Sequence, residues 1–267
     1  MQRLIVREPS GLFRSSPDGL ADRLSGRFRT HRPIVAGGAV AFAGYVVMTA
    51  ILVGLGLLLT KLLVSGPVGR WDNSVERWFV TQRTTTLNTV SSVGSLMGAS
   101  FTVIGIVVFA SIVLVIKRCW REIGLLVAGL ILEFTVFLTT AILVHRPRPP
   151  VVKLEVAPPT ASFPSGHTAA AFVLYVSLAL VITSHVRSAT ARALVWLLAI
   201  LIPIYVAISR LYRGMHHPTD VMGSVVLGAG ALMFALLACR TAGAVTDRRA
   251  HEVGTAEPSP TPVEVLP

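Results

Sequence analysis

Three clusters of basic, acidic and hydroxyl-bearing residues interrupt a chain that is otherwise apolar. Each cluster lies at the end of a long hydrophobic stretch. Guanidinium groups pair well with phosphate oxygens, and imidazole groups can attack phosphorus or move protons. The arginines and histidines of these clusters therefore predict a site for a phosphate group. The clusters are His145–Pro150 (HRPRPP), Pro164–His167 (PSGH) and Ser209–Asp220 (SRLYRGMHHPTD).

The second cluster predicts the start of a helix at the edge of a phosphate site. Ser165 and Gly166 come directly before an apolar stretch. Free N–H groups and the positive end of the dipole attract anions to a helix start, and glycine permits close approach of a ligand to the backbone. Arg148 and Arg210, from the other two clusters, have the side chain best suited to grip phosphoryl oxygens.

Three further residues have the types that proton transfer and nucleophilic attack require. His216 and Asp220 are four residues apart, which places them on one face if the helix extends that far. The carboxylate could then accept one imidazole N–H and leave the other nitrogen nucleophilic. His167 comes from a different stretch and could protonate a leaving oxygen.

The composition of the 267-residue chain indicates a membrane protein. Hydrophobic residues make up 53% of it and charged residues only 14%, against about 25% charged in average soluble chains. With two cysteines and a mean hydropathy of +0.70, soluble, disordered and disulfide-stapled classes are excluded. The net charge of +11 is then interpreted through the placement of basic residues, not as a nucleic-acid site.

Six stretches are long and apolar enough to cross a bilayer as helices, so the predicted fold is an all-α, polytopic membrane protein. The first is longer than the core of a cleavable signal peptide and is interpreted as a retained anchor. The predicted spans are Ile34–Thr60, Leu87–Ile116, Ile123–Val144, Thr168–Ser184, Ala193–Ser209 and Val221–Cys239.

Basic residues predict the orientation of these spans. Fifteen of the 24 Lys and Arg residues lie in the two tails and in the loops after spans two and four. The positive-inside tendency places those segments, and both termini, in the cytoplasm of a plasma-membrane protein. Cys119 and Cys239 fall on this reducing side, so no disulfide is expected. The loops after spans three and five then share the extracytoplasmic face, together with Arg146, Arg148, Arg210 and Arg213.

This arrangement predicts three regions. Residues 1–33 form a cytoplasmic Arg-rich tail, residues 34–239 a six-helix transmembrane domain, and residues 240–267 a disordered cytoplasmic tail with four prolines. Residues 70–83 alternate arginines with aromatic residues, which is typical of an interfacial anchor. Glu133 is interpreted as a packing residue, because it is about 22 Å along a helix from Arg148.

The clusters resemble the motifs of the type 2 phosphatidic acid phosphatase superfamily, which includes lipid phosphate and undecaprenyl-diphosphate phosphatases and vanadium haloperoxidases. The family pattern is Lys-x6-Arg-Pro, Pro-Ser-Gly-His and Ser-Arg-x5-His-x3-Asp. Pro164–His167 match the second motif, and Ser209, Arg210, His216 and Asp220 the third. In the first, Arg148-Pro149 match, but Ala141 stands where the family has Lys. The resemblance covers about residues 85–240.

The resemblance implies a metal-independent hydrolase without a cofactor that acts on a membrane lipid phosphate or polyprenyl pyrophosphate. It implies that His216 attacks phosphorus, Asp220 orients it and His167 transfers protons. Arg148, Arg210, Ser165 and Gly166 would hold the phosphoryl oxygens. For the missing Lys, our hypothesis is replacement by Arg146 or Arg213.

Other functions remain open on the sequence alone. A lipid phosphotransferase would use the same residues with an alcohol in place of water. A non-catalytic lipid-binding or transport relative is disfavoured by His167, His216 and Asp220. A haloperoxidase is least favoured, because such enzymes are soluble and the Lys is missing. The oligomeric state and the specific lipid are not predicted.

Overall fold

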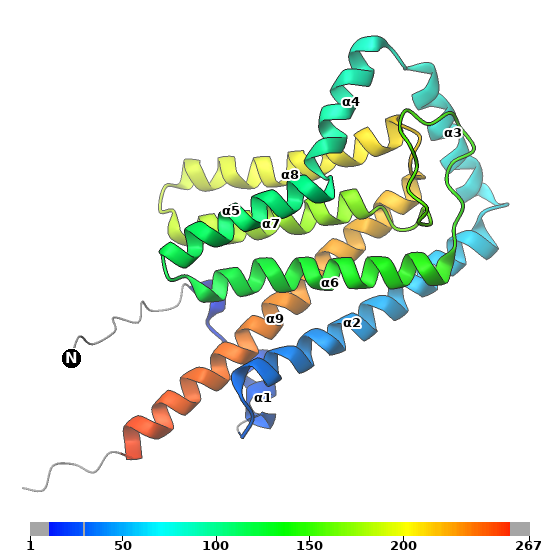
Figure 1. Cartoon of the computed structure of the whole chain (residues 1–267). Coiled ribbons are helices and arrows are strands. Elements are labelled where there is room, and N and C mark those ends of the chain that lie inside the picture. The colour runs from blue at the N-terminus through cyan, green and yellow to red at the C-terminus, as the bar shows by residue number, and fades with distance from the viewer. Residues whose placement is uncertain (1–10, 29, 257–267) are drawn as a thin grey trace, which may run out of the picture.

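The computed structural model describes residues 11–28 and 30–256, and within these ranges every regular element is helical (Figure 1). The all-α fold expected from the sequence is confirmed. The helices are α1 (Leu20–Arg27), α2 (Pro33–Leu57), α3 (Pro67–Thr81), α4 (Thr85–Met97), α5 (Ser100–Ile116), α6 (Trp120–Val144), α7 (Gly166–His185), α8 (Ala189–Tyr212) and α9 (Pro218–Ala256), with the 3-10 turn η1 (Gly11–Phe13) and the π-helical segment η2 (Leu58–Leu63).

Among the described residues, five helical stretches are long and apolar enough to cross a membrane, or six when α4 and α5 count as one bent span. These are the six predicted stretches. Their lipid-facing sides explain the exposed Leu, Ile, Val and Phe side chains, which a bilayer covers.

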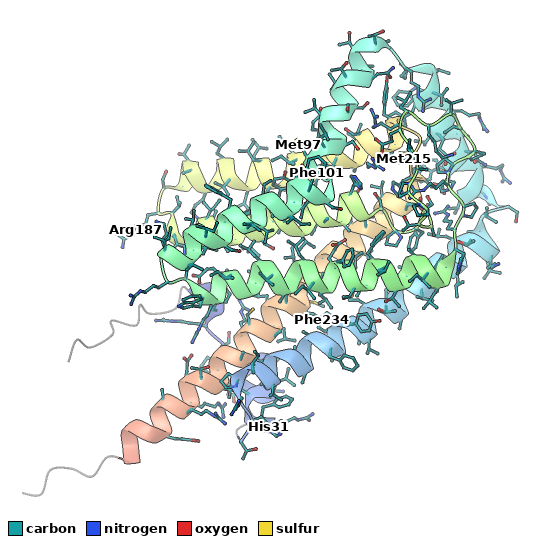
Figure 2. The ribbon with its side chains drawn as sticks, in the orientation of Figure 1. His31, Met97, Phe101, Arg187, Met215 and Phe234 are labelled. Carbon is teal, nitrogen blue, oxygen red and sulfur yellow. The ribbon has the colours of Figure 1, made fainter. Side chains whose placement is uncertain are left out.

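The second span is broken, where the sequence predicted one continuous helix. The two halves meet at an angle of 47° near Met97 and Phe101 (Figure 2). A side chain at Gly98 would stand 2.7 Å from the carbonyl oxygen of His167, so only glycine lets the chain approach α7 this closely. The freed carbonyl of Met97 accepts a hydrogen bond from the Tyr175 hydroxyl (3.2 Å).

Helix α9 packs against α2, α6 and α7 and holds the bundle together (Figure 1). Close contact with α2 depends on small residues: a Cβ at Gly44 would overlap the Phe234 ring at 2.5 Å. Leu52, Val136 and Leu227 are fully buried where the three helices meet. This core fixes the relative depth of the helix ends that carry the motifs.

The connections after α2, α6 and α8 lie at one end of the bundle, and the described chain ends lie at the other (Figure 1). Arg187, between α7 and α8, and Met215, between α8 and α9, mark these opposite ends in Figure 2. The first and third motifs therefore share one end, as the sequence predicted.

The predicted tails contain more structure than their composition indicated. Helix α9 continues to Ala256, so the predicted disordered tail is helical between residues 240 and 256; residues 257–267 lie outside the described residues, as do residues 1–10. Ala244 and Val245 are buried, which stabilises this extension. Helix α1 packs beside it, and Asp22 pairs with Arg248 at 2.5 Å.

Candidate active site

A cavity of about 240 Å³ opens where the three motifs converge. Its wall includes Arg148, Gly166, His167, Arg210 and His216. The structure thus brings together five of the predicted site residues, from four separate segments of the chain. The side chains of Ser165, Asp220, Arg146 and Arg213 lie behind this wall, as described below.

The start of α7 forms one side of the cavity. Ser165 is the residue before the first turn and is fully buried; its N–H donates to the Ser224 hydroxyl at 2.8 Å. Gly166 and His167 follow, and the first N–H groups of a helix have no acceptor within it. A Cβ at Gly166 would lie 3.1 Å from the Phe137 ring. Ser165 therefore fixes the helix start, and Gly166 presents it to the cavity.

His216 is held through its Nδ1 atom. Nδ1 lies 2.8 Å from the Ser162 carbonyl oxygen and 3.6 Å from Asp220 Oδ2. Because a carbonyl can only accept, Nδ1 carries the proton and Nε2 has the free lone pair. Burial lowers the pKa of His216 despite the opposing effect of Asp220. The imidazole is therefore neutral at pH 7 and available as a nucleophile.

Asp220 acts less directly on His216 than the sequence predicted. Its carboxylate accepts from the His217 backbone N–H at 2.8 Å, from the Ser162 hydroxyl, and from Arg146 at 2.5 Å. The first two contacts order the segments on both sides of His216. Asp220 therefore sets the position of the Ser162 carbonyl, and the carbonyl orients the imidazole.

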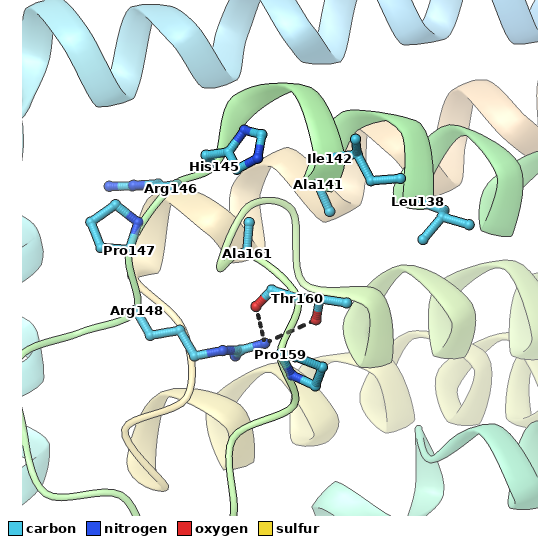
Figure 3. A pocket seen from close by; sticks show the side chains of 10 residues that line it. All are labelled: Leu138, Ala141, Ile142, His145, Arg146, Pro147, Arg148, Pro159, Thr160 and Ala161. Atoms are coloured by element: carbon cyan, nitrogen blue, oxygen red, sulfur yellow. Dashed lines mark hydrogen bonds between the residues drawn. The ribbon is translucent and has the colours of Figure 1, made fainter.

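Arg146 lies behind the cavity wall, bound between carboxylates. Besides Asp220, it donates to Asp72 of α3 at 2.8 Å, and Thr219 accepts from it at 2.8 Å. Only 4% of the residue is exposed. In Figure 3, Arg146 and Arg148 extend to different sides of the loop. Arg146 is thus placed to hold Asp220, and it lines the cavity beside Ala141 but not the cavity of His216.

Arg148 and Arg210 both reach the cavity, and each is fixed at one end. Arg148 donates to the Met215 carbonyl at 2.7 Å and to the Thr160 carbonyl at 3.3 Å (Figure 3). Arg210 donates to Ser95 at 2.6 Å. The Nε–H group of each arginine is buried without a hydrogen-bond partner among the described residues. Two guanidinium groups that line one cavity favour an anionic ligand there.

Glu155, which sequence analysis missed, connects Arg210 with Arg213. It accepts from Arg210, and from Arg213 Nε at 2.7 Å. Burial acts to raise the pKa of Glu155, but the two arginines lower it overall. Arg213 also donates to the Leu154 carbonyl at 2.9 Å, so its donors hold the loop before α7. The structure does not bring Arg213 to the cavity.

Helix α3 supplies a second set of residues that the sequence did not assign to the site. Glu76 lies 2.5 Å from His217 Nδ1, and Asp72 binds Arg146 and Thr219. Burial opposes protonation of His217, but Glu76 raises its pKa overall. Asp72 and Glu76 are four residues apart in an amphipathic segment, and this spacing was the available signal. The segment therefore supports the catalytic loop in addition to its interfacial position.

Glu133 lines the same cavity as Arg148 and His167, so the prediction that it is remote from the site is wrong. The predicted distance assumes a helix that continues to Arg148. Helix α6 instead ends at Val144, His145 adopts a left-handed φ of 51°, and the chain turns back.

A second cavity, of about 450 Å³, shares Arg148 and Thr160 with the first (Figure 3). Ala141, at the position of the family Lys, lines it together with Arg146. The short alanine side chain therefore leaves space next to an arginine that also lines the cavity of His216.

The fold and the site define a class: a multi-pass membrane protein whose histidines and arginines converge on an anion site at one end of a helical bundle. The PAP2 superfamily model matches residues 122–243, and with the relative described next it shows that the chain belongs to this superfamily. It is 31% identical over 177 residues to phosphatidylglycerophosphatase B of Bacillus subtilis (strain 168), an alignment that covers 64% of this chain and 85% of that protein.

Two solved structures resemble the chain to different degrees. The crystal structure of a transmembrane PAP2 type phosphatidylglycerolphosphate phosphatase from Bacillus subtilis superposes with a TM-score of 0.60 at 24% identity, over 73% of this chain and 92% of that one. Aquifex aeolicus LpxE gives a TM-score of 0.45 at 25% identity, over 60% of this chain and 92% of that one.

Proposed function

We propose that this protein hydrolyses a lipid phosphate or polyprenyl pyrophosphate through a phosphohistidine on His216. One observation carries the proposal: a neutral His216, held at Nδ1, shares a cavity with His167 and with two arginines. This is the set of groups that nucleophilic phosphoryl transfer requires.

The residues divide the reaction into two displacements. In the first, His216 Nε2 attacks phosphorus, the bond to the leaving oxygen breaks, and His167 gives that oxygen a proton. In the second, His167 takes a proton from water, whose oxygen attacks phosphorus and breaks the P–N bond. Arg148, Arg210 and the N–H groups at the start of α7 stabilise the phosphoryl oxygens in both steps.

The position of the site supports a substrate presented from the bilayer. Phe134 lines the cavity, and 58% of it is exposed on the lipid-facing side of α6. A lipid can therefore place its phosphate at the helix ends while its chains stay in hydrocarbon. The excess of basic residues at the other end of the bundle supports cytoplasmic termini and an extracytoplasmic site in the plasma membrane. The named activity of the Bacillus relative makes a glycerophospholipid with a terminal phosphate the first substrate to test.

Phosphate release from purified protein in detergent tests this proposal. The panel contains phosphatidate, phosphatidylglycerophosphate and a polyprenyl pyrophosphate, each with and without EDTA. We expect inorganic phosphate from at least one lipid at a rate that EDTA does not change, because each role is assigned to a protein group. Within the described ranges, the cluster with metal-ligand spacing (Cys119, Glu122 and His185) lies at the other end of the bundle.

Two results would contradict the proposal. Absence of phosphate release across the panel would favour a non-catalytic relative. Transfer of the phosphoryl group to an added alcohol, without inorganic phosphate, would favour a phosphotransferase.

The cavity beside Ala141 predicts a gain of activity. Ala141→Lys should raise kcat/KM by about tenfold, because a charged hydrogen bond contributes about 1.5–3 kcal/mol and the cavity of about 450 Å³ has room for the side chain. Ala141→Met, of similar length and without charge, is the control. Equal rates for the two variants would show that a cation at this position does not reach the phosphate.

A further inference from the structure

Glu133 is a buried carboxyl group in the middle of α6, within the wall of the catalytic cavity. Only 3% of the residue is exposed. The other buried carboxyl groups in the described ranges all have partners: Asp72 and Asp220 bind Arg146, Glu76 contacts His217, and Glu122 lies 3.3 Å from His185. Within the described ranges, no hydrogen-bonding or charged side chain acts on Glu133; only its burial does.

The apolar surroundings of Glu133 make a carboxyl group without a hydrogen-bond partner energetically unfavourable. Phe134, Phe137 and Ala170 line the same part of the cavity. An intramembrane carboxyl among apolar side chains is unfavourable unless a hydrogen-bonding group faces it. Leucine would fill such a position at no electrostatic cost. A carboxyl residue that lines the cavity at such a position indicates a polar group on the ligand.

Helix geometry places Glu133 at a defined depth from the phosphate. The Phe137 ring packs where a Cβ of Gly166 would be, at 3.1 Å, and Gly166 is at the turn that faces the phosphate. Glu133 precedes Phe137 by one helical turn, so it lies about 5–6 Å deeper along the bundle. The organic part of a bound ester, which extends from the phosphate toward the hydrocarbon, passes this level.

The charged side chains that line the cavity limit which chemical groups Glu133 can bind. A second anionic group would be repelled by a carboxylate. An ammonium group would be repelled by Arg148 and Arg210, which line the same cavity. A neutral hydroxyl fits both constraints, since it can donate to a carboxylate and also pair with a carboxylic acid.

We propose that Glu133 is a specificity-determining residue that binds a hydroxyl group of the leaving alcohol, on the carbon next to the phosphate-bearing carbon. This inference rests on the proposed phosphatase function and specifies its substrate class as β-hydroxy phosphate esters. Gly166 and Glu133 line one cavity of about 240 Å³, so a hydroxyl bound by Glu133 would lie close to the phosphate, as a hydroxyl on the adjacent carbon does.

A matched pair of substrates tests the assignment. One is 1-acyl-glycerol 3-phosphate, with a free hydroxyl beside the phosphate-bearing carbon. The other is the 2-deoxy analogue, an acylated propanediol phosphate that differs only by that hydroxyl. The kcat/KM ratio for the two lipids is measured for wild type, Glu133→Leu, Glu133→Gln and Glu122→Gln. Glu122 is the control, because it is a buried glutamate of the same helix at the opposite end of the bundle.

We expect wild type to prefer the hydroxylated lipid by about tenfold, the effect of one hydrogen bond to a buried charged group. Glu133→Leu should remove the preference, so that the kcat/KM ratio for the two lipids falls to about one. Glu133→Gln, which can still hydrogen-bond, should retain part of the preference, and Glu122→Gln all of it.

The opposite results would overturn the assignment. A wild type without preference would show that Glu133 does not bind this hydroxyl. An equal loss on both lipids in Glu133→Leu would make it a structural residue. No phosphate release by wild type from either lipid, or from the wider panel, would overturn the proposed function itself and this inference with it.

Discussion

Replacing His216 by alanine should lower phosphate release by at least about a thousandfold, because the variant has no nucleophile for the first displacement. The adjacent imidazole of His217 cannot take this position. His217 Nδ1 contacts Glu76 and its Nε2 lies 3.1 Å from the Pro147 carbonyl, so both of its nitrogens are engaged. The expected loss is in kcat, measured by phosphate release in detergent.

Direct detection of the intermediate separates a nucleophile from a structural residue. With a lipid labelled at the phosphate, a rapid quench of wild type should yield labelled protein that is stable in alkali and labile in acid, and His216→Ala should yield none. His145→Asn is the control, because His145 lies at the same end of the bundle and asparagine tolerates its positive φ. Phosphate release or labelling that persists in His216→Ala would contradict the assignment.

The groups proposed to contact the phosphate could be predicted from the sequence, because they are close together in short motifs. Pro164–His167 need only a helix that begins at Gly166, and Ser209–Asp220 span one short connection. The apolar stretches of bilayer length also predicted which loops share one side of the membrane. That prediction placed the first and third motifs at the same end of the bundle.

The residues that hold those groups could not be predicted in this way. Glu155 and Ser162 lie in a loop without regular structure, and their contacts with Arg213 and His216 depend on how that loop folds back over α6. The hypothesis about Arg146 and Arg213 considered only charge and proximity in sequence. The structure places a carboxylate against each of them, because a buried guanidinium requires a partner.

The break in the second span and the extension of α9 could not be predicted from the sequence either. An uninterrupted apolar stretch predicts a straight helix, but the contact between Gly98 and the backbone of His167 is made between distant segments. The polar composition after Arg240 predicted a tail, but packing of Ala244 and Val245 keeps the helix intact. In both cases tertiary contacts override local composition.

Helix α3 provides the second large prediction, since its two carboxylates were not recognised in the sequence. Asp72 should be essential to the stability of the site. It is the α3 partner of Arg146, at 2.8 Å, and the exposed fractions of the two side chains are 2% and 4%. Asp72→Ala leaves Arg146 paired with Asp220 but removes its second carboxylate and the acceptor of the Thr219 N–H and hydroxyl groups. A hydrogen bond to a charged group contributes about 1.5–3 kcal/mol. We therefore expect Asp72→Ala to lower the free energy of unfolding by at least about 1.5–3 kcal/mol and to reduce turnover, because Arg146 also positions Asp220.

The chain offers a matched control for this prediction in a second aspartate–arginine pair. Asp247 accepts from Arg121 at 2.9 Å, but the exposed fractions there are 62% and 27%, and exposed pairs contribute only about 0–1 kcal/mol. Unfolding of Asp72→Ala and Asp247→Ala in the same detergent, followed by phosphate release, compares the two. If Asp72→Ala were as stable and as active as Asp247→Ala, α3 would be an interfacial anchor alone, as its arginines and tryptophans first indicated. A large difference would make α3 part of the active site, because its carboxylates fix, through Arg146, the loop that orients His216.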